Sequence, residues 1–302
     1  MTGFSPRTLR LDGENDIRTD MNIPLLHGLR DVTDRYDAFF IDIYGVIHDG
    51  LKLFPGTKDC LENLKAAGKA VCLLSNTARR RHETRDDLAA MGLPPDLYTA
   101  IVTAGDSAHD SMKKYRGKTC WYTGTDENLG LIEGHGIAVQ DAPESAHFVL
   151  NTIPGTEFYD ENDLYKKMDR AVTLRLPMIC ADPDLVVNIG NRQVKCGGTF
   201  ALYYEQRGGQ VEYHGKPHAP VYEAAWEFLG KPDKSRLAGI GDALHTDMQG
   251  ANRFSIDGIL NLDGIHGHEV RDPGGIPDPG KLARLVASQE HKPSAALNTF
   301  AW

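Results

Sequence analysis

The chain has 302 residues, of which 41% are hydrophobic, so it can form one large domain or two medium ones. Its formal net charge of −9, without a long basic run, argues against nucleic acid as a partner, because phosphate backbones bind clustered lysine and arginine. No segment approaches the ~18 apolar residues of a membrane helix. Because residues 1–20 lack an apolar segment and a cleavage site, we expect a cytoplasmic protein without a membrane partner.

Short apolar runs alternate with helical patterns over residues 37–105, which is typical of a parallel sheet wrapped in helices. The composition predicts strands in "DAFFID" (37–42), "KAVCLLSN" (69–76) and "TAIVTAG" (99–105). Helices are expected in "TKDCLENLKAAG" (57–68) and "RRRHETRDDLAAMG" (79–92), each of which ends at a glycine. These elements make up one half of a doubly wound domain.

A second set of units follows between residues 106 and 211. The sequence pattern of this region predicts strands at 118–124, 146–151 and 176–182, and helices through 129–132 and over 161–173. The first pattern then resumes with "VEYHGKP" (211–217), a helix over 219–230, the strand "SRLAGIGD" (235–242), a helix over 246–254 and the strand "DGILNL" (257–262). The fold class is therefore α/β, with a doubly wound parallel-sheet core (1–105 plus 212–302) and an inserted α/β domain (106–211). We predict only surface packing for the first 30 residues and for 291–302.

The five cysteines are odd in number and widely spaced, with no CxxC pair. They are Cys60, Cys72, Cys120, Cys180 and Cys196, and we interpret them as small core residues.

Polar residues stand at the ends of the predicted strands. Asp42 ends the first strand, Ser75 and Asn76 end the second, Lys216 follows the strand after the insertion, and Asp242 ends "LAGIGD", with Asp247 five residues later. In an open α/β sheet, such positions gather at one crevice, the usual ligand site. Carboxylates with a lysine, a hydroxyl and an amide suit a Mg²⁺ ion and a phosphate group.

Four stretches in order resemble the motifs of the haloacid dehalogenase superfamily, in its class IIA branch of NagD-like phosphatases. "DIYGVIHDG" is similar to the first motif, "LLSN" to the second, "GKPHAPVY" to the third and "GDALHTDMQGA" to the fourth. "CADPDLVV" and "KCGGTFALYYE" also resemble the inserted cap of that branch. The resemblance covers nearly all of residues 35–265, and it implies that the inserted domain is a cap of the C2 type.

The resemblance implies a role for each matching residue. Asp42 would attack phosphorus and form an aspartyl phosphate, which divides one hard displacement into two easier ones. The other oxygen of Asp42, the Tyr44 carbonyl and Asp242 would hold Mg²⁺, with Asp247 in or beside that shell. Ser75, Asn76 and Lys216 would hold the phosphoryl group and offset its charge.

Other interpretations of these residues remain open. An aspartate at a strand end often only caps a turn, Ser75 and Asn76 can cap the next helix, and Asp247 can serve the dipole of a helix start. "GIGDAL" superficially resembles a dinucleotide-binding loop, but it lacks the third glycine of that motif. Cys196 has no evident histidine partner, which favours a structural thiol over a nucleophile.

Tyr44 departs from the family pattern, which has a second aspartate at this position as general acid and base. A phenol with an ordinary pKa of ~10 can donate a proton but is a poor base at neutral pH. His48 and Asp49, on the flap expected after Gly45, can replace it. Two hypotheses follow: an Mg²⁺-dependent phosphatase of a small cytosolic phosphometabolite, and a weak or inactive relative that binds phosphorylated ligands.

Substrate specificity is expected in cap loops such as "NTIPGTEFYD" (151–160) and "ADPDLVV" (181–187). Asn151, Asp182 and Asp184 are candidates for substrate contact there, together with His48 on the flap. An exposed sheet edge on the cap also allows pairing with a second copy, so a homo-oligomer is possible.

Overall fold

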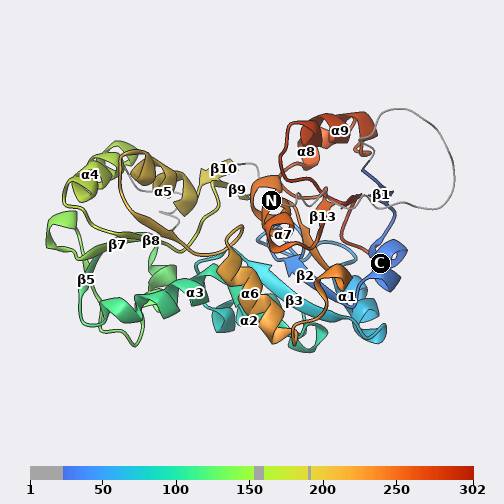
Figure 1. The fold of residues 1–302 in the computed structure, drawn as a ribbon, viewed down its shortest axis with the longest axis horizontal. Helices are drawn as coiled ribbons and strands as arrows, with labels where there is room; N and C mark the ends of the chain where they lie inside the picture. The colour runs from blue at the N-terminus through green and yellow to red at the C-terminus, as the bar shows by residue number, and fades with distance from the viewer. Residues whose placement is uncertain (1–22, 153–159, 190–191) are drawn as a thin grey trace, which may run out of the picture. The chain divides into compact units, whose positions relative to one another are not determined.

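The structure is a computed structural model, and it describes residues 23–152, 160–189 and 192–302. Its first sheet has seven strands among these residues, in the order β1-β14-β13-β12-β2-β3-β4. Figure 1 labels β1, β2, β3 and β13 of this sheet. The strands are β1 (Leu25–Leu26), β2 (Ala38–Asp42), β3 (Ala70–Ser75), β4 (Ala100–Thr103), β12 (Leu237–Gly241), β13 (Asp257–Asn261) and β14 (Ala295–Leu297). The pairs β2·β3, β2·β12, β12·β13, β13·β14 and β1·β14 are all parallel.

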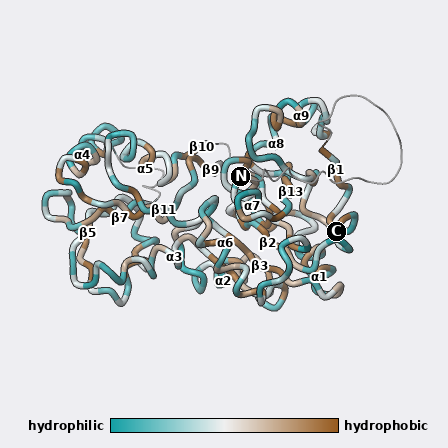
Figure 2. The backbone as a smooth tube through the Cα atoms, in the orientation of Figure 1, coloured by the Kyte–Doolittle hydropathy of each residue, from teal (hydrophilic) through white to brown (hydrophobic). Residues whose placement is uncertain are grey.

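The central strands of this sheet are apolar on both faces. Every residue of β2 and of β12 is buried, as expected of a parallel sheet covered on both sides by helices. Figure 2 colours β2 and β3 mostly as hydrophobic, whereas helices such as α1 alternate between the two colours. Burial on both faces explains why the apolar runs of the sequence are uninterrupted within these strands, and why polar residues begin only where the strands end.

A second sheet has five strands, again counted over the described ranges, in the order β11-β8-β7-β5-β6. All its pairings are parallel. Its strands are β5 (Thr119–Thr123), β6 (Ala138–Gln140), β7 (Phe148–Asn151), β8 (Met178–Cys180) and β11 (Val211–Tyr213). Strands β9 (Val186–Ile189) and β10 (Arg192–Lys195) form a separate antiparallel pair.

Helices connect the strands of both sheets. The α-helices are α1 (Thr57–Ala66), α2 (Arg81–Ala90), α3 (Ala104–Ser111), α4 (Glu161–Thr173), α5 (Gly197–Gln206), α6 (Ala219–Phe228), α7 (Gln249–Phe254), α8 (Gly267–Val270) and α9 (Pro279–Ala287). The short helices are η1 (Leu29–Arg35), η2 (Pro95–Leu97), η3 (Met112–Tyr115), η4 (Asp126–Ile132), η5 (Pro143–Ser145), η6 (Lys234–Arg236) and η7 (Leu244–Met248). All of the short helices are 3-10 helices except η7, which is a π-helix.

The structure confirms the α/β class and most of the predicted strands and helices, and it corrects three expectations. The strand after the insertion, β11, pairs with β8 in the second sheet, not with the strands of the first. The C-terminal segment forms β14 inside the first sheet, where it pairs with β1 on one side and β13 on the other. The helix expected through 129–132 is a longer 3-10 helix, η4.

The chain divides into two compact units. The first unit contains the described part of Met1–Leu74, together with Leu88–Ile101 and Tyr222–Trp302. The second contains Ser75–Asp87 and Val102–Val221. The boundaries predicted at 105/106 and 211/212 stay a prediction.

The cysteines and the lengths of the helices bear on two further expectations. All five cysteines are buried free thiols, as expected of core residues. Among the residues that the structure describes, no helix has the length and apolar character to cross a membrane.

Candidate active site

Asp42 is the last residue of β2 and lies at the carboxyl end of the first sheet. Its side chain is 7% exposed, and its Oδ1 accepts a hydrogen bond from the backbone N–H of Ile43 at 2.7 Å. The buried apolar strand before it leaves little freedom in the position of its Cα. Asp42 is therefore a carboxylate held at the rim of a rigid element, with limited contact with solvent.

Asp242 follows β12, the strand next to β2. Its Oδ2 accepts a hydrogen bond from the backbone N–H of Ile265 at 2.8 Å. Glycines surround the carboxylate: a Cβ at Gly45 would lie 2.2 Å from Oδ2, and a Cβ at Gly264 would lie 1.9 Å from it. Because no side chain fits at such distances, both positions need glycine to let the main chain approach the carboxylate.

Asp247 lies on the π-helix η7, one residue before its end. The backbone N–H groups of Asp247 and Met248 both donate to the carbonyl of Ala243, at 3.0 and 3.2 Å, which widens the turn. The side chain turns back, so that Oδ2 accepts from the N–H of Ala243 at 3.1 Å. A Cβ at Gly241 would lie 2.0 Å from Asp247 Cγ. Such π-turns occur often at functional sites, because they redirect one side chain.

The three carboxylates form one cluster. Asp42, Asp242 and Asp247 are all buried, and each offers an oxygen within 4.8 Å of the others. Like charges so close in a buried place repel one another unless a cation lies among them. Hard carboxylate oxygens are the ligands that Mg²⁺ and Ca²⁺ prefer, so the donor set fits a divalent cation of this kind.

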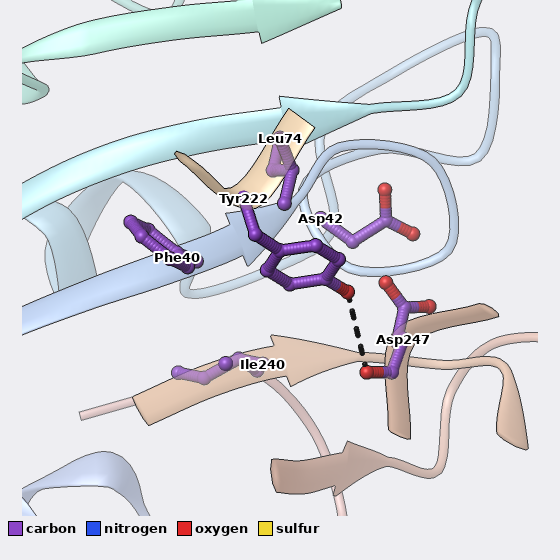
Figure 3. Close-up of a pocket in the computed structure, with 7 residues that line it drawn as sticks. Phe40, Asp42, Leu74, Tyr222, Ile240 and Asp247 are labelled. Carbon is purple, nitrogen blue, oxygen red and sulfur yellow. Dashed lines mark hydrogen bonds between the residues drawn. The ribbon is translucent and has the colours of Figure 1, made fainter. Parts of the chain in front are cut away.

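A small cavity of about 10 Å³ lies behind two of these carboxylates (Figure 3). Its lining is mostly apolar and comprises Phe40, Asp42, Leu74, Tyr222, Gly239, Ile240 and Asp247. This volume is close to the smallest that holds one water molecule. Figure 3 shows the Tyr222 hydroxyl turned toward the backbone of Asp247, to whose carbonyl it donates at 3.4 Å. Two of the three clustered carboxylates, those of Asp42 and Asp247, therefore also border this small cavity.

Tyr44 begins the flap, which comprises residues 44–53 and is closed by short β-bridges between Tyr44 and His48 and between His48 and Leu53. The Tyr44 ring lies edge-on to the His48 ring, with centroids 5.6 Å apart. A Cβ at Gly50 would lie 3.0 Å from Tyr44 Cε2 and 3.3 Å from its hydroxyl oxygen. The phenol therefore packs against the flap itself.

The polar side chains of the flap contribute to its own turn. Asp49 Oδ1 accepts from the N–H groups of Leu51 and Lys52, both at 2.9 Å, and these bonds lower the pKa of Asp49 from its ordinary value. His48 Nδ1 accepts from the N–H of Gly50 at 2.9 Å. A carboxylate stabilised in its charged form is a poor proton donor at neutral pH. This geometry disfavours Asp49 as a replacement for the missing acid.

In the second unit, two other predicted site residues, Asn76 and Lys216, are joined by hydrogen bonds. Asn76 Oδ1 accepts from the backbone N–H of Lys216 at 2.6 Å, and its Nδ2 donates to the Lys216 carbonyl at 3.1 Å. Nδ2 also donates to Asp184 Oδ1 at 2.9 Å. Asn76 and Lys216 are both 3% exposed. One amide therefore holds the lysine of the third motif beside the loop that carries Asp184.

Ser75 is the last residue of β3, directly after Leu74, whose partner in the sheet register is Asp42. Ser75 Oγ accepts from the N–H of Thr77 at 3.2 Å. Helix α2 begins only at Arg81, so neither Ser75 nor Asn76 is positioned to cap it. The capping interpretation of these two residues is therefore wrong.

Asn151 is held by hydrogen bonds inside the second unit, and its predicted contact with the substrate stays a prediction. It is 0% exposed, its Oδ1 accepts from Thr123 Oγ1 at 2.8 Å, and its Nδ2 donates to the Gly197 carbonyl at 2.7 Å. These bonds tie β7 to β5 and to the start of α5. The rest of that predicted loop, residues 153–159, lies outside the described residues.

Asp182 and Cys196 are also buried in the second unit. Burial raises the pKa of Asp182 well above its ordinary value, and the nearby Asp184 carboxylate adds to the rise. Burial likewise raises the pKa of the Cys196 thiol, which is 2% exposed, and so disfavours the reactive thiolate. The role of Asp182 in substrate binding stays a prediction, whereas Cys196 has the properties of a structural thiol.

Three residues near the carboxylates had no clear signal in the sequence. Tyr222 and Asn261 lie in apolar segments that predict only a helix and a strand, and Gly264 lies in a loop. Asn261 Nδ2 donates to the carbonyl of Gly45 at 2.9 Å. An isolated polar residue at the end of an apolar strand is the one feature that can draw attention to Asn261.

Comparisons with known proteins agree with these observations. Residues 39–138 match a model of the haloacid dehalogenase-like hydrolase family, and residues 213–287 match a second model, described as HAD-hydrolase-like. A crystal structure of a haloacid dehalogenase-like hydrolase from Brucella suis is 30% identical, with a TM-score of 0.78. The alignment covers 91% of this chain and 100% of that one.

Two sequence relatives have lower identity to this chain than the Brucella suis protein has. Chronophin of Bos taurus is 26% identical over 261 residues, which cover 78% of this chain and 84% of chronophin. A 4-nitrophenylphosphatase of Schizosaccharomyces pombe is 24% identical over 282 residues, which cover 82% of this chain and 92% of the relative. All three similarities extend over most of both chains.

Proposed function

The chain belongs to the haloacid dehalogenase-like hydrolase family, and we propose that it is an Mg²⁺-dependent phosphatase that cleaves a small phosphorylated metabolite through Asp42. Hydrolysis of phosphoric monoesters is the activity that the family and the phosphatase relatives support. The observation that carries the proposal is the cluster of Asp42, Asp242 and Asp247.

Asp42 acts as the nucleophile. One of its oxygens attacks phosphorus, the bond from phosphorus to the ester oxygen breaks, and an aspartyl phosphate forms. Water then attacks the phosphorus of this intermediate, which releases phosphate and restores the carboxylate. The end of a buried strand suits this role, because a nucleophile must stay within a short distance of the atom it attacks.

The other carboxylates would hold the cation. Asp242 and Asp247, with the second oxygen of Asp42 and the backbone carbonyl of Tyr44, are the groups that would hold Mg²⁺. When bound, Mg²⁺ supplies positive charge that offsets the negative charge of the phosphoryl oxygens. The N–H groups of Ile265 and Ala243 orient two of these carboxylates, which reduces the reorganisation needed during the reaction.

The phosphoryl group is bound by residues of the second and third motifs. Lys216 supplies a positive charge, and Ser75 and Asn76 supply hydrogen bonds. The amide of Asn76 also fixes the main chain of Lys216, and hence the origin of its long side chain. Asp182 and Asp184 on the neighbouring loop, and His48 on the flap, are the proposed contacts for the rest of the substrate.

Tyr44 is the proposed proton donor to the leaving group. A phenol can donate but is a poor base, so attack of water on the intermediate receives less help than from an aspartate, and general acid–base help is commonly worth ~10²–10⁴-fold. Because a phenol is also a weaker acid than a carboxylic acid, we expect both slow turnover and a preference for esters with good leaving groups. A protein that only binds phosphorylated ligands is the second candidate, and the Tyr44 substitution is the observation that favours it.

A panel of phosphate monoesters tests the proposal. The purified chain is assayed for phosphate release with Mg²⁺, with a chelator, and after Mg²⁺ is restored, and ligand binding is followed in parallel by thermal shift. We expect hydrolysis that the chelator abolishes and Mg²⁺ restores, and, in acid-quenched samples, a phosphoryl group on the peptide that contains Asp42. Binding of esters without hydrolysis of any of them would favour the binding protein.

A further inference from the structure

Asn261 is a fully buried amide at the end of an apolar strand. It is 0% exposed, as are Ile259 and Leu260 before it and Leu262 after it. The sheet register here depends on backbone pairing, with Asn261 opposite Leu297 of β14, and needs no amide side chain. An aliphatic residue would suit this position better, because a buried amide must replace its lost contacts with water.

The contacts of the amide explain why it is present. Its Nδ2 donates to the carbonyl of Gly45 at 2.9 Å, a bond that joins positions 216 residues apart in the chain. Its Oδ1 has no hydrogen-bond partner within the described part of the chain. An unpaired buried acceptor reduces stability, and such groups in a folded protein call for a functional explanation. The hydrogen bond to Gly45 is thus retained although the Asn261 side chain reduces the stability of the fold.

Gly45 lies at the point where the flap leaves the carboxylate cluster. Its φ angle of +82° is one that side chains rarely permit, and its Cα faces the Asp242 carboxylate so closely that a Cβ would lie 2.2 Å from Oδ2. Its N–H donates to the carbonyl of His48 at 3.0 Å. Because glycine has more conformational freedom than other residues, this turn depends on contacts from outside for its precise shape.

We propose that Asn261 is a positioning residue, which fixes the main chain of Gly45 and thereby the Tyr44 carbonyl next to it, so that this carbonyl and Asp242 keep the geometry that a divalent cation requires. The inference rests on the proposed function, in which both groups are ligands. Asn261 touches no reacting atom, and its effect reaches the cation only through Gly45. Residues of this kind commonly change metal affinity when they are replaced.

The test compares two variants with a matched control. Asn261→Leu removes the donor at similar volume, and Asn261→Ala removes it without any steric conflict if the first variant folds poorly. The control is Asn252→Leu, because Asn252 Nδ2 makes a bond of the same type, to the carbonyl of Lys292 at 3.1 Å, and this bond anchors α7 to a distant segment. For each protein, Mg²⁺ affinity is measured calorimetrically in the absence of substrate, and stability is measured by urea unfolding.

We expect both Asn261 variants to bind Mg²⁺ at least ~10-fold more weakly than the unaltered chain, the lower end of the range for residues that orient ligands. The Asn252 control should lose stability but keep its Mg²⁺ affinity. An unchanged Mg²⁺ affinity in folded Asn261→Ala would overturn this inference and leave the proposed function standing. Failure of the unaltered chain to bind Mg²⁺ would overturn both.

Discussion

The two groups of site residues are held in position by different means. On the first unit, Asp242 and Asp247 accept hydrogen bonds from backbone N–H groups, and glycines let the main chain approach them closely. On the second unit, the Asn76 side chain itself holds the main chain of Lys216 and the carboxylate of Asp184. The carboxylates of the first unit should therefore be displaced when a methyl group is added to one of these glycines. The position of Lys216 in the second unit should be lost when the amide of Asn76 is removed.

Replacement of Asp42, the proposed nucleophile, should have the largest effect. Asp42→Asn keeps the shape and hydrogen bonding of the side chain but removes the attacking charge, so we expect the rate of ester hydrolysis to fall by at least ~10³-fold. Phosphate release is measured with excess enzyme and Mg²⁺, and ester binding is measured separately. Hydrolysis near the rate of the unaltered chain would mean that Asp42 is structural.

The glycine contacts of the first unit can be broken by one methyl group. Gly264→Ala places a Cβ where 1.9 Å separates it from Asp242 Oδ2, so the carboxylate must move. We expect hydrolysis to fall by ~10²-fold, as for a displacement of about 1 Å at a catalytic group. Gly280→Ala is the control, since its Cβ would lie 3.1 Å from the nearest atom, Asp278 Oδ1. Equal activity of the two variants would contradict the proposed role of this contact.

Truncation of the Asn76 side chain should affect only the site residues of the second unit. Asn76→Ala removes the bonds to Lys216 and Asp184, and we expect the KM for phosphate esters to rise by roughly tenfold because a charged group loses its hydrogen-bonded support. Calorimetry should find unchanged Mg²⁺ affinity in this variant and weaker affinity in Asp242→Asn. If Asn76→Ala weakens Mg²⁺ binding as much as Asp242→Asn does, the two groups do not act separately.

Changes at Tyr44 should have the smallest effect. Tyr44→Asp should raise turnover modestly, roughly two- to tenfold, and mostly for esters with poor leaving groups, because these depend most on protonation. The gain stays small because a flap that packs against a tyrosine ring does not position an aspartate well. Rates for esters with a range of leaving groups are compared among the unaltered chain, Tyr44→Asp and Tyr44→Phe.

The outcomes at Tyr44 separate three interpretations. If the phenol is the working acid, Tyr44→Phe should lose turnover only on poor leaving groups, and Tyr44→Asp need not increase it. If the phenol merely occupies the position, Tyr44→Phe should leave the rates unchanged. Absence of hydrolysis in all three proteins would favour the binding protein.

The sequence alone determined the local features of this protein. The runs before Asp42 and Asp242 predicted buried strands correctly, because a parallel strand covered on both faces must be apolar along its whole length. The residues after those runs had to lie at one edge of the sheet, so the carboxylates of the candidate site were predictable. The helix over 161–173 was also predicted correctly, since helical periodicity depends on neighbouring residues.

Only the tertiary structure decided which strand pairs with which, and which buried residues support the site. A strand of three residues such as β11 carries too little pattern to choose between two parallel sheets, and β14 is paired only because the core offers it an apolar edge. The bond from Asn261 to Gly45 spans 216 positions, and its partner is a backbone carbonyl, which every residue has. Contacts of this kind leave no local pattern, because they arise only when distant segments fold together.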